Sequence, residues 1–225
     1  MNTHALKRAL SNVVAFVWVN IPMLPRNRAL LEEARKERDG HEMALRHLFD
    51  SIQGHPSGVQ DRIYRRFALH LAEEVSPYFR LAESVGVLAA LRTYVDEGAG
   101  WDAVVLARNE QMAAPVADLP VSVEGVSEHY YNLSDSVIRH AVEWYPDYSD
   151  CCVLDYVATV THQKFPTSVL NNAAAYLQAD QFRTNLYAKL SIMLKDCEQE
   201  EFRCSKLRGE VRPGVRDLGV RPRRG

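Results

Sequence analysis

Apolar side chains recur every three or four residues along most of this chain, and that spacing limits the possible folds more than any other feature. The clearest series is Ile63, Phe67, Leu71 and Val75, which falls on one face of an amphipathic helix. Residues 101–112 fit either a helix or a short buried strand. Similar series predict further helices at residues 6–17, 27–52, 77–98, 127–144, 149–165 and 168–202. We therefore expect an all-α fold, a bundle-like globular body of roughly eight helices with a disordered basic C-terminal tail.

The composition is that of a soluble globular protein, with 47% hydrophobic and 25% charged residues. No apolar run reaches the roughly 18 residues that a membrane-spanning helix needs, so we expect no membrane association. Pro115 and Pro120 interrupt a stretch that lacks helical spacing. We predict an N-terminal helical half over residues 1–112, a linker over 113–126, a C-terminal helical half over 127–203 and a basic tail over 204–225.

Positive charge is concentrated at the C-terminal end of the chain. Residues 203–225 hold eight bases and two acids, a net charge of +6, whereas the remaining residues hold 19 bases and 27 acids, a net charge of −8. Arginine interleaved with Gly and Pro suits RNA or another polyanion, because a guanidinium binds phosphate through two parallel hydrogen bonds. The candidate nucleic-acid-binding residues are Arg203, Lys206, Arg208, Arg212, Arg216, Arg221, Arg223 and Arg224. A solubilising tail that binds nothing explains the same composition, and both interpretations stay open.

A second basic stretch, Arg62, Arg65 and Arg66, either extends such a binding surface or lies on a solvated helix face. Aromatic clusters at residues 130–131 and 144–148 favour core packing or a protein interface, because few bases surround them. We therefore expect self-association or a partner protein. The preferred function is a helical binding or assembly protein whose tail contacts RNA or another polyanion, and a nucleocapsid-like role is one form of it.

Histidine and an acid also stand at helical spacing in three places, which suggests an alternative function. Three helices that each offer an imidazole and a carboxylate can supply ligands for iron or manganese. The alternative is therefore a di-iron-like, non-haem oxidase or hydroxylase, whereas the binding protein needs no cofactor. The order of residues differs from the Glu-x-x-His motif of ferritin-like di-iron proteins, and we expect these to be surface pairs. The pairs are Glu37 with His41, His70 with Glu73 and His140 with Glu143.

Common catalytic signatures are absent from the sequence: it has no phosphate-binding glycine loop, no nucleophile elbow and no His-Glu-x-x-His zinc helix. The four cysteines, at positions 151, 152, 197 and 204, match no zinc spacing, so we expect reduced thiols and a cytoplasmic location. Residues 1–31 contain four bases and no acid, a composition typical of organelle-targeting segments. Targeting by this segment is therefore kept as an alternative to a first core helix.

Overall fold

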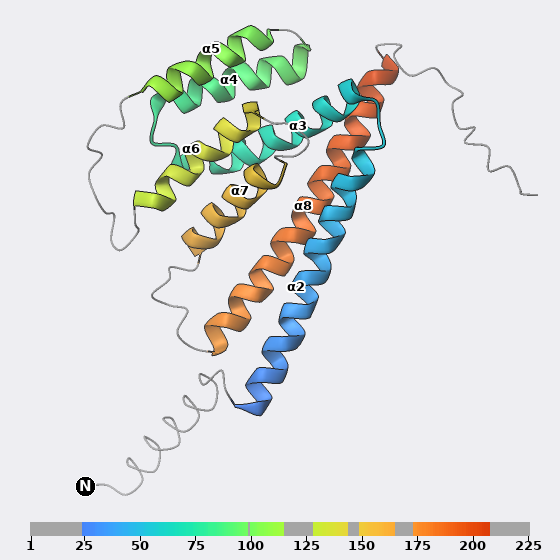
Figure 1. Ribbon diagram of the computed structural model, residues 1–225, viewed down its shortest axis with the longest axis vertical. Coiled ribbons are helices and arrows are strands. Elements are labelled where there is room, and N and C mark those ends of the chain that lie inside the picture. Colours follow the sequence, from blue (N-terminus) through green and yellow to red (C-terminus); the bar gives the residue numbers. More distant parts are fainter. Residues whose placement is uncertain (1–23, 99, 115–127, 144–148, 165–172, 208–225) are drawn as a thin grey trace, which may run out of the picture.

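The computed structural model describes residues 24–98, 100–114, 128–143, 149–164 and 173–207 (Figure 1). All regular structure in these residues is helical, which confirms the all-α prediction. The predicted helix at 6–17 and the predicted disordered tail beyond Leu207 lie outside the described residues. The described α-helices are α2 (Pro25–Ile52), α3 (Ser57–Val75), α4 (Ala82–Glu97), α5 (Trp101–Ala113), α6 (Glu128–Glu143), α7 (Ser149–Lys164) and α8 (Ala173–Leu207).

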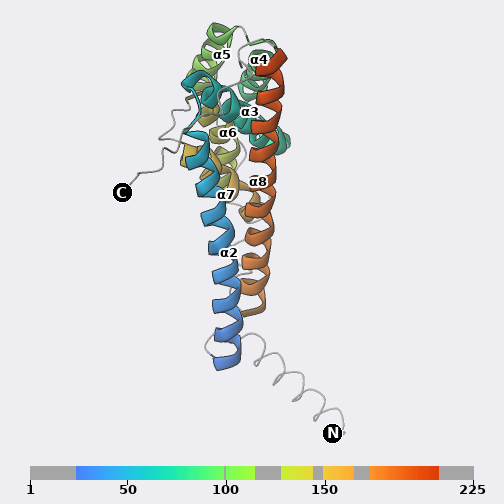
Figure 2. The ribbon, with the colours of Figure 1, turned by 90° about the vertical axis from the view of Figure 1, so that its right-hand side faces the viewer.

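The two longest helices, α2 and α8, lie side by side and run in the same direction (Figures 1 and 2). In their contact, Arg38 Nη1 donates to Asp180 Oδ1 at 2.7 Å. The residues that α2 and α8 bury along this contact are spaced by multiples of seven, which is the pattern of a coiled coil. Such a seam is narrower than the apolar face that a helix presents to the core of a full bundle. Leu30 lies outside this seam and is exposed. The buried residues at this spacing are Leu31, Leu45 and Ile52 of α2 and Ala173, Asp180, Tyr187 and Leu194 of α8.

The helix α3 lies at the centre of the remaining body and packs against α4, α6, α7 and α8. Its predicted apolar stripe, Ile63, Phe67, Leu71 and Val75, is fully buried, which confirms that prediction. A single hydrophobic core includes side chains from both α2–α5 and α6–α8. The two predicted halves therefore share one core, while most of the predicted linker lies outside the described residues.

The segment after α3 differs from the prediction that Ser76 and Pro77 open a helix. These residues form a 3-10 turn at Ser76–Tyr78, and α4 begins only at Ala82. Contacts with α6 hold the intervening backbone: Ser134 Oγ donates to the Tyr78 carbonyl at 2.8 Å, and the Arg80 N–H donates to Asp135 Oδ2 at 3.3 Å. Tertiary hydrogen bonds thus outweigh a local helix-start signal here.

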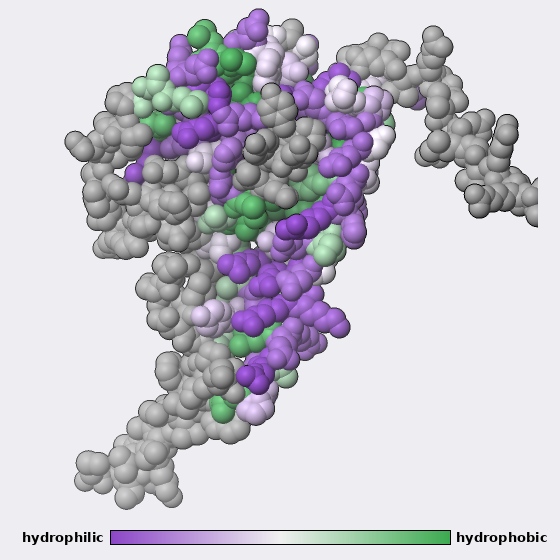
Figure 3. Space-filling view, in the orientation of Figure 1, coloured by the Kyte–Doolittle hydropathy of each residue, from purple (hydrophilic) through white to green (hydrophobic). Residues whose placement is uncertain are grey.

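Trp101–Ala113, which the sequence left open between helix and strand, is a helix. The helix α2 continues through Gly40 without a break. Gly98 ends α4 in the left-handed conformation with φ +71°, as its position predicts. In the space-filling view, the side of α2 that faces the viewer is mainly hydrophilic (Figure 3). None of the described helices is both long and apolar enough to cross a lipid bilayer.

Candidate functional site

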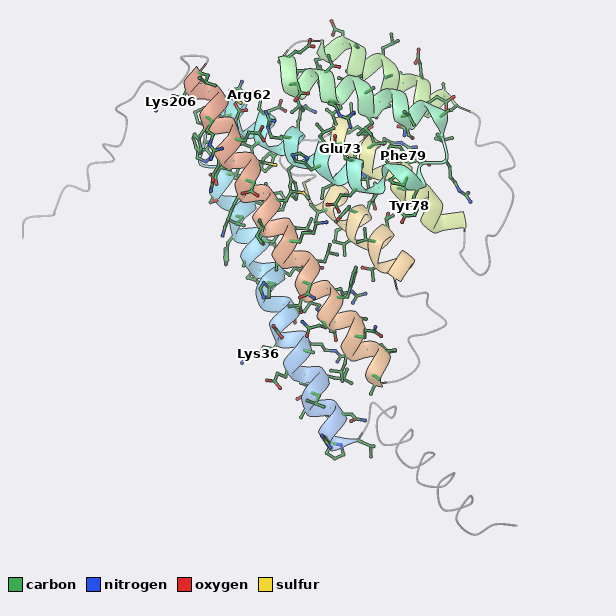
Figure 4. The ribbon with its side chains drawn as sticks, turned by 180° about the vertical axis from the view of Figure 1, so that it is seen from behind. Lys36, Arg62, Glu73, Tyr78, Phe79 and Lys206 are labelled. Carbon is green, nitrogen blue, oxygen red and sulfur yellow. The ribbon has the colours of Figure 1, made fainter. Side chains whose placement is uncertain are left out.

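The basic residues that the structure describes at the C-terminal end are Arg203 and Lys206. Both are exposed on the last turns of α8, and neither forms an ion pair with a described residue. Lys206 lies at the same end of the molecule as Arg62 of α3 (Figure 4). The other candidate residues, Arg208, Arg212, Arg216, Arg221, Arg223 and Arg224, lie outside the described residues.

The arginines of α3 form contacts within the protein instead of a solvated basic face. Arg62 Nε donates to Glu201 Oε1 at 2.6 Å, and Arg66 Nη1 lies 3.2 Å from Glu200 Oε1. Both contacts join α3 to the last turns of α8. Arg66 is also largely buried, with 8% of its surface exposed. The sequence left two interpretations of this basic stretch open, an extension of the nucleic-acid-binding surface and a solvated helix face. The ion pairs and the burial of Arg66 agree with neither of them.

Arg65 is buried as well and joins three elements of the body. Its Nε donates to both carboxylate oxygens of Asp61 at 2.9 Å. Its Nη1 donates to the carbonyl oxygens of Ala141 and Val142 at the end of α6, at 3.4 and 3.2 Å. Its guanidinium carbon lies 3.7 Å from the centre of the Trp101 ring, a cation–π contact. Arg65 therefore caps α6 and fixes the start of α5.

These three arginines line a small pocket of about 180 Å³ beside Tyr94 and Gly98. An anion in this pocket would meet more negative than positive charge. Glu97 also lines the pocket, and the arginines are already paired with Asp61, Glu200 and Glu201. The pocket is therefore a poor phosphate site.

The residues of the predicted metal site lie in separate places. Glu37 is exposed on α2, and His41 is half-buried one turn later. His70 Nδ1 lies 3.2 Å from Glu73 Oε2, and the other oxygen of Glu73 accepts hydrogen bonds from Arg92 of α4.

The residues of the third predicted pair, His140 and Glu143, each form an ion pair with a different residue. His140 Nδ1 lies 2.8 Å from Asp155 Oδ2 of α7, while Glu143 pairs with Arg108 of α5. Across the described residues, no group of three or more His, Cys, Asp or Glu side chains has an arrangement that could hold a metal ion. Of the three predicted pairs, His70 with Glu73 is in contact, whereas His140 and Glu143 each pair with a residue of another helix.

A buried polar network joins α4, α5 and α6, and no sequence pattern predicts it. Ser84 Oγ donates to Asp135 Oδ1 at 2.6 Å, and Gln111 Nε2 lies 2.6 Å from Ser84 Oγ and 3.3 Å from the Asp135 carbonyl oxygen. Burial raises the pKa of Asp135 above its ordinary value, although the hydrogen bond from Ser84 opposes the shift. The three residues are far apart in sequence, so only the tertiary fold brings them together.

Glu74 joins three helices at the other end of α3. The Tyr156 hydroxyl of α7 donates to Glu74 Oε2, and Lys189 Nζ of α8 lies 2.5 Å from Glu74 Oε1. Burial raises the pKa of Tyr156 strongly, and the negative charge of Glu74 adds to the shift. No sequence pattern predicts that Glu74 links α7 and α8, because these helices are far from α3 in the chain.

An open concave surface lies along α8 beside His70 of α3, and we call it the α8 groove. It is open to solvent, has a volume of about 540 Å³ and is lined mainly by apolar surface. Cys197 also lines it, and burial raises the pKa of this thiol to about 12, so the side chain is neutral and acts as an apolar group. Its principal α8 residues are Asn185, Ala188, Lys189, Ile192, Met193 and Asp196.

No family model, curated protein or solved structure matches this chain.

Proposed function

We propose that this chain is a helical binding and assembly protein whose basic C-terminal end, from Arg203 onward, contacts RNA or another polyanion. The observation that carries the proposal is the separation of charge, +6 over residues 203–225 and −8 over the rest. A polyanion is attracted to such an end and repelled by an acidic body.

The use of bases within the body supports this choice. Many of its arginines are neutralised by the protein's own carboxylates, as in the pairs of Arg38 with Asp180 and Arg92 with Glu73. Arg203 and Lys206, by contrast, extend from α8 without an ion pair to any described residue. The described part of the basic end therefore carries positive charge that is available to a partner.

The state of the described cysteines is consistent with a reducing compartment. Cys197 and Cys204, which lie on the described helix α8, are free thiols, and Cys197 is buried. We therefore include a cytoplasmic location in the proposal.

Deletion of residues 208–225 tests the proposal. This truncation point keeps Ser205, which is buried and donates from Oγ to Glu201 Oε1 at 2.9 Å, so α8 stays complete. The deletion removes six arginines and two acids. We expect the affinity for a single-stranded RNA oligonucleotide, measured by fluorescence anisotropy, to fall at least tenfold.

A pair of double substitutions provides the matched control. Arg203→Gln with Lys206→Gln removes two exposed bases at the C-terminal end, whereas Arg26→Gln with Lys36→Gln removes two exposed bases from α2. We expect the first pair to weaken RNA binding and the second to leave it unchanged. Equal effects of the two pairs, or full affinity after the deletion, would show that the basic end is not the contact.

A further inference from the structure

The centre of the α8 groove is apolar and accessible. Ile192 has 62% of its surface exposed, and the neighbouring Met193 is half-buried against the core. Seen from behind, α8 lies in front of α2 and its outer side faces the viewer (Figure 4). When a partner covers an exposed aliphatic side chain in an open groove, apolar surface is removed from water, and this favours binding.

Opposite charges flank the apolar centre of the groove. Lys189 lies on one side of Ile192, and although it pairs with Glu74, 52% of its side chain is still exposed. Asp196 lies on the other side, is exposed and forms no ion pair with a described residue. The groove thus presents a positive group, an apolar centre and a negative group in order along one helix.

We infer that the α8 groove is the docking site for a second copy of this chain, with the two α8 helices antiparallel about a two-fold axis between Ile192 and Met193. In that arrangement each residue faces the one equally far from the axis on the other copy. Lys189 therefore faces Asp196 of the second copy, and the symmetry produces this pair twice.

The other α8 residues that line the groove also face compatible residues of the second copy in this arrangement. Ile192 faces Met193, which buries the apolar centre. Ala188 lies opposite Cys197, whose side chain is buried in its own core, so neither residue obstructs the close approach of the two helices. Farther out, Asn185 faces Glu200, a residue that already pairs with Arg66 and needs no further cation. No like charges face each other across the axis.

The size of the groove sets the expected strength of association. Residues 185–200 span roughly 24 Å of helix, so the contact is smaller than the roughly 800 Å² per partner of a standard stable interface. We expect a reversible dimer that forms in the micromolar range. This inference rests on the assembly part of the proposed function and is independent of RNA binding.

Sedimentation equilibrium of the full chain without RNA measures the association directly. We expect the average mass to rise with concentration from the 25.5 kDa monomer toward a dimer and no further. Ile192→Asp should weaken association at least tenfold. Leu106→Asp on α5 is the control, because Leu106 is also 62% exposed but lies outside the groove.

A charge-reversal experiment tests the geometry. Asp196→Lys alone places lysines opposite each other, and Lys189→Glu alone places acids opposite each other, so we expect each variant to be monomeric. An equimolar mixture should dimerise, because the two variants together restore two opposite-charge pairs across the axis. Circular dichroism of each variant confirms that it is folded before mixing.

Several results would overturn the inference: a wild-type chain that stays monomeric, larger open assemblies, equal effects at Ile192 and Leu106, or a mixture that stays monomeric. RNA affinity of the Ile192→Asp monomer separates the two proposals. Loss of the dimer with RNA binding retained supports both, whereas a dimer without RNA binding supports only the docking site.

Discussion

Asp135 is a buried carboxylate held in a network of neutral donors, and its ionisation should govern part of the pH dependence of stability. Burial raises its pKa above the ordinary value of 3.8. Because the folded state then holds the proton more tightly than the unfolded state, the free energy of unfolding falls as pH rises from 3.8 through the raised value. We expect Asp135→Asn to remove this part of the slope, measured by urea unfolding between about pH 4 and pH 7.

The control for that slope is Asp96→Asn, since Asp96 is exposed on α4 and outside the network. This variant should keep the wild-type pH dependence. If Asp135→Asn keeps it too, the network does not hold the carboxylate as described.

The histidines are the second prediction at the residue scale. His70 pairs with Glu73, and its side chain is 41% exposed, so His70→Ala should change the free energy of unfolding by no more than about 0.5 kcal/mol. Metal analysis of the purified wild-type chain and of His70→Ala and His140→Ala should give the same, far from stoichiometric, iron and manganese content. Stoichiometric metal that both substitutions abolish would instead support the enzyme interpretation.

At the scale of elements, the unbroken course of α2 through Gly40 gives a direct prediction. Gly40 is exposed, and an added Cβ would meet no atom within 4 Å. Gly40→Ala should therefore raise the free energy of unfolding by about 0.5 to 1 kcal/mol, because alanine loses less backbone entropy in a helix. Gly98→Ala should lower it by about 1 kcal/mol, because Gly98 has φ +71°. A loss of stability at both positions would contradict a continuous α2.

The same elements show how far the sequence predicts this fold. The sequence predicts the buried face of α3 correctly, because a helix that packs against the core on most sides buries a wide apolar face. Ile63 and Val75, at the two ends of that face, are fully buried. The sequence does not predict that α2 packs against α8. The contact buries Asp180 and Ala173 as well as leucines, and it joins two segments that are far apart in the chain. The start of α4 was missed because the side chains of Ser134 and Asp135 decide it.

At the scale of the whole molecule, the sequence alone predicts one candidate site, whereas the others depend on the tertiary fold. The charge of residues 203–225 is a property of composition, so the sequence states it fully. The buried roles of Arg65 and Arg66 and the self-matching face of α8 depend on which helices are neighbours, and no local pattern encodes that. The protein combines an acidic body, helical where the structure describes it, with one basic end, and we propose that one face of α8 binds a second copy.

The most direct test of this account is the salt dependence of RNA affinity, compared between the intact chain and the chain lacking residues 208–225. Each phosphate contact on a single strand contributes about 0.7 to the slope of log affinity against log salt concentration. If the six arginines of the deleted segment make most contacts, the intact chain should show a slope near −4, that is about 0.7 for each of six contacts. The truncated chain should show a much shallower slope, and equal slopes for the two chains would contradict the central claim.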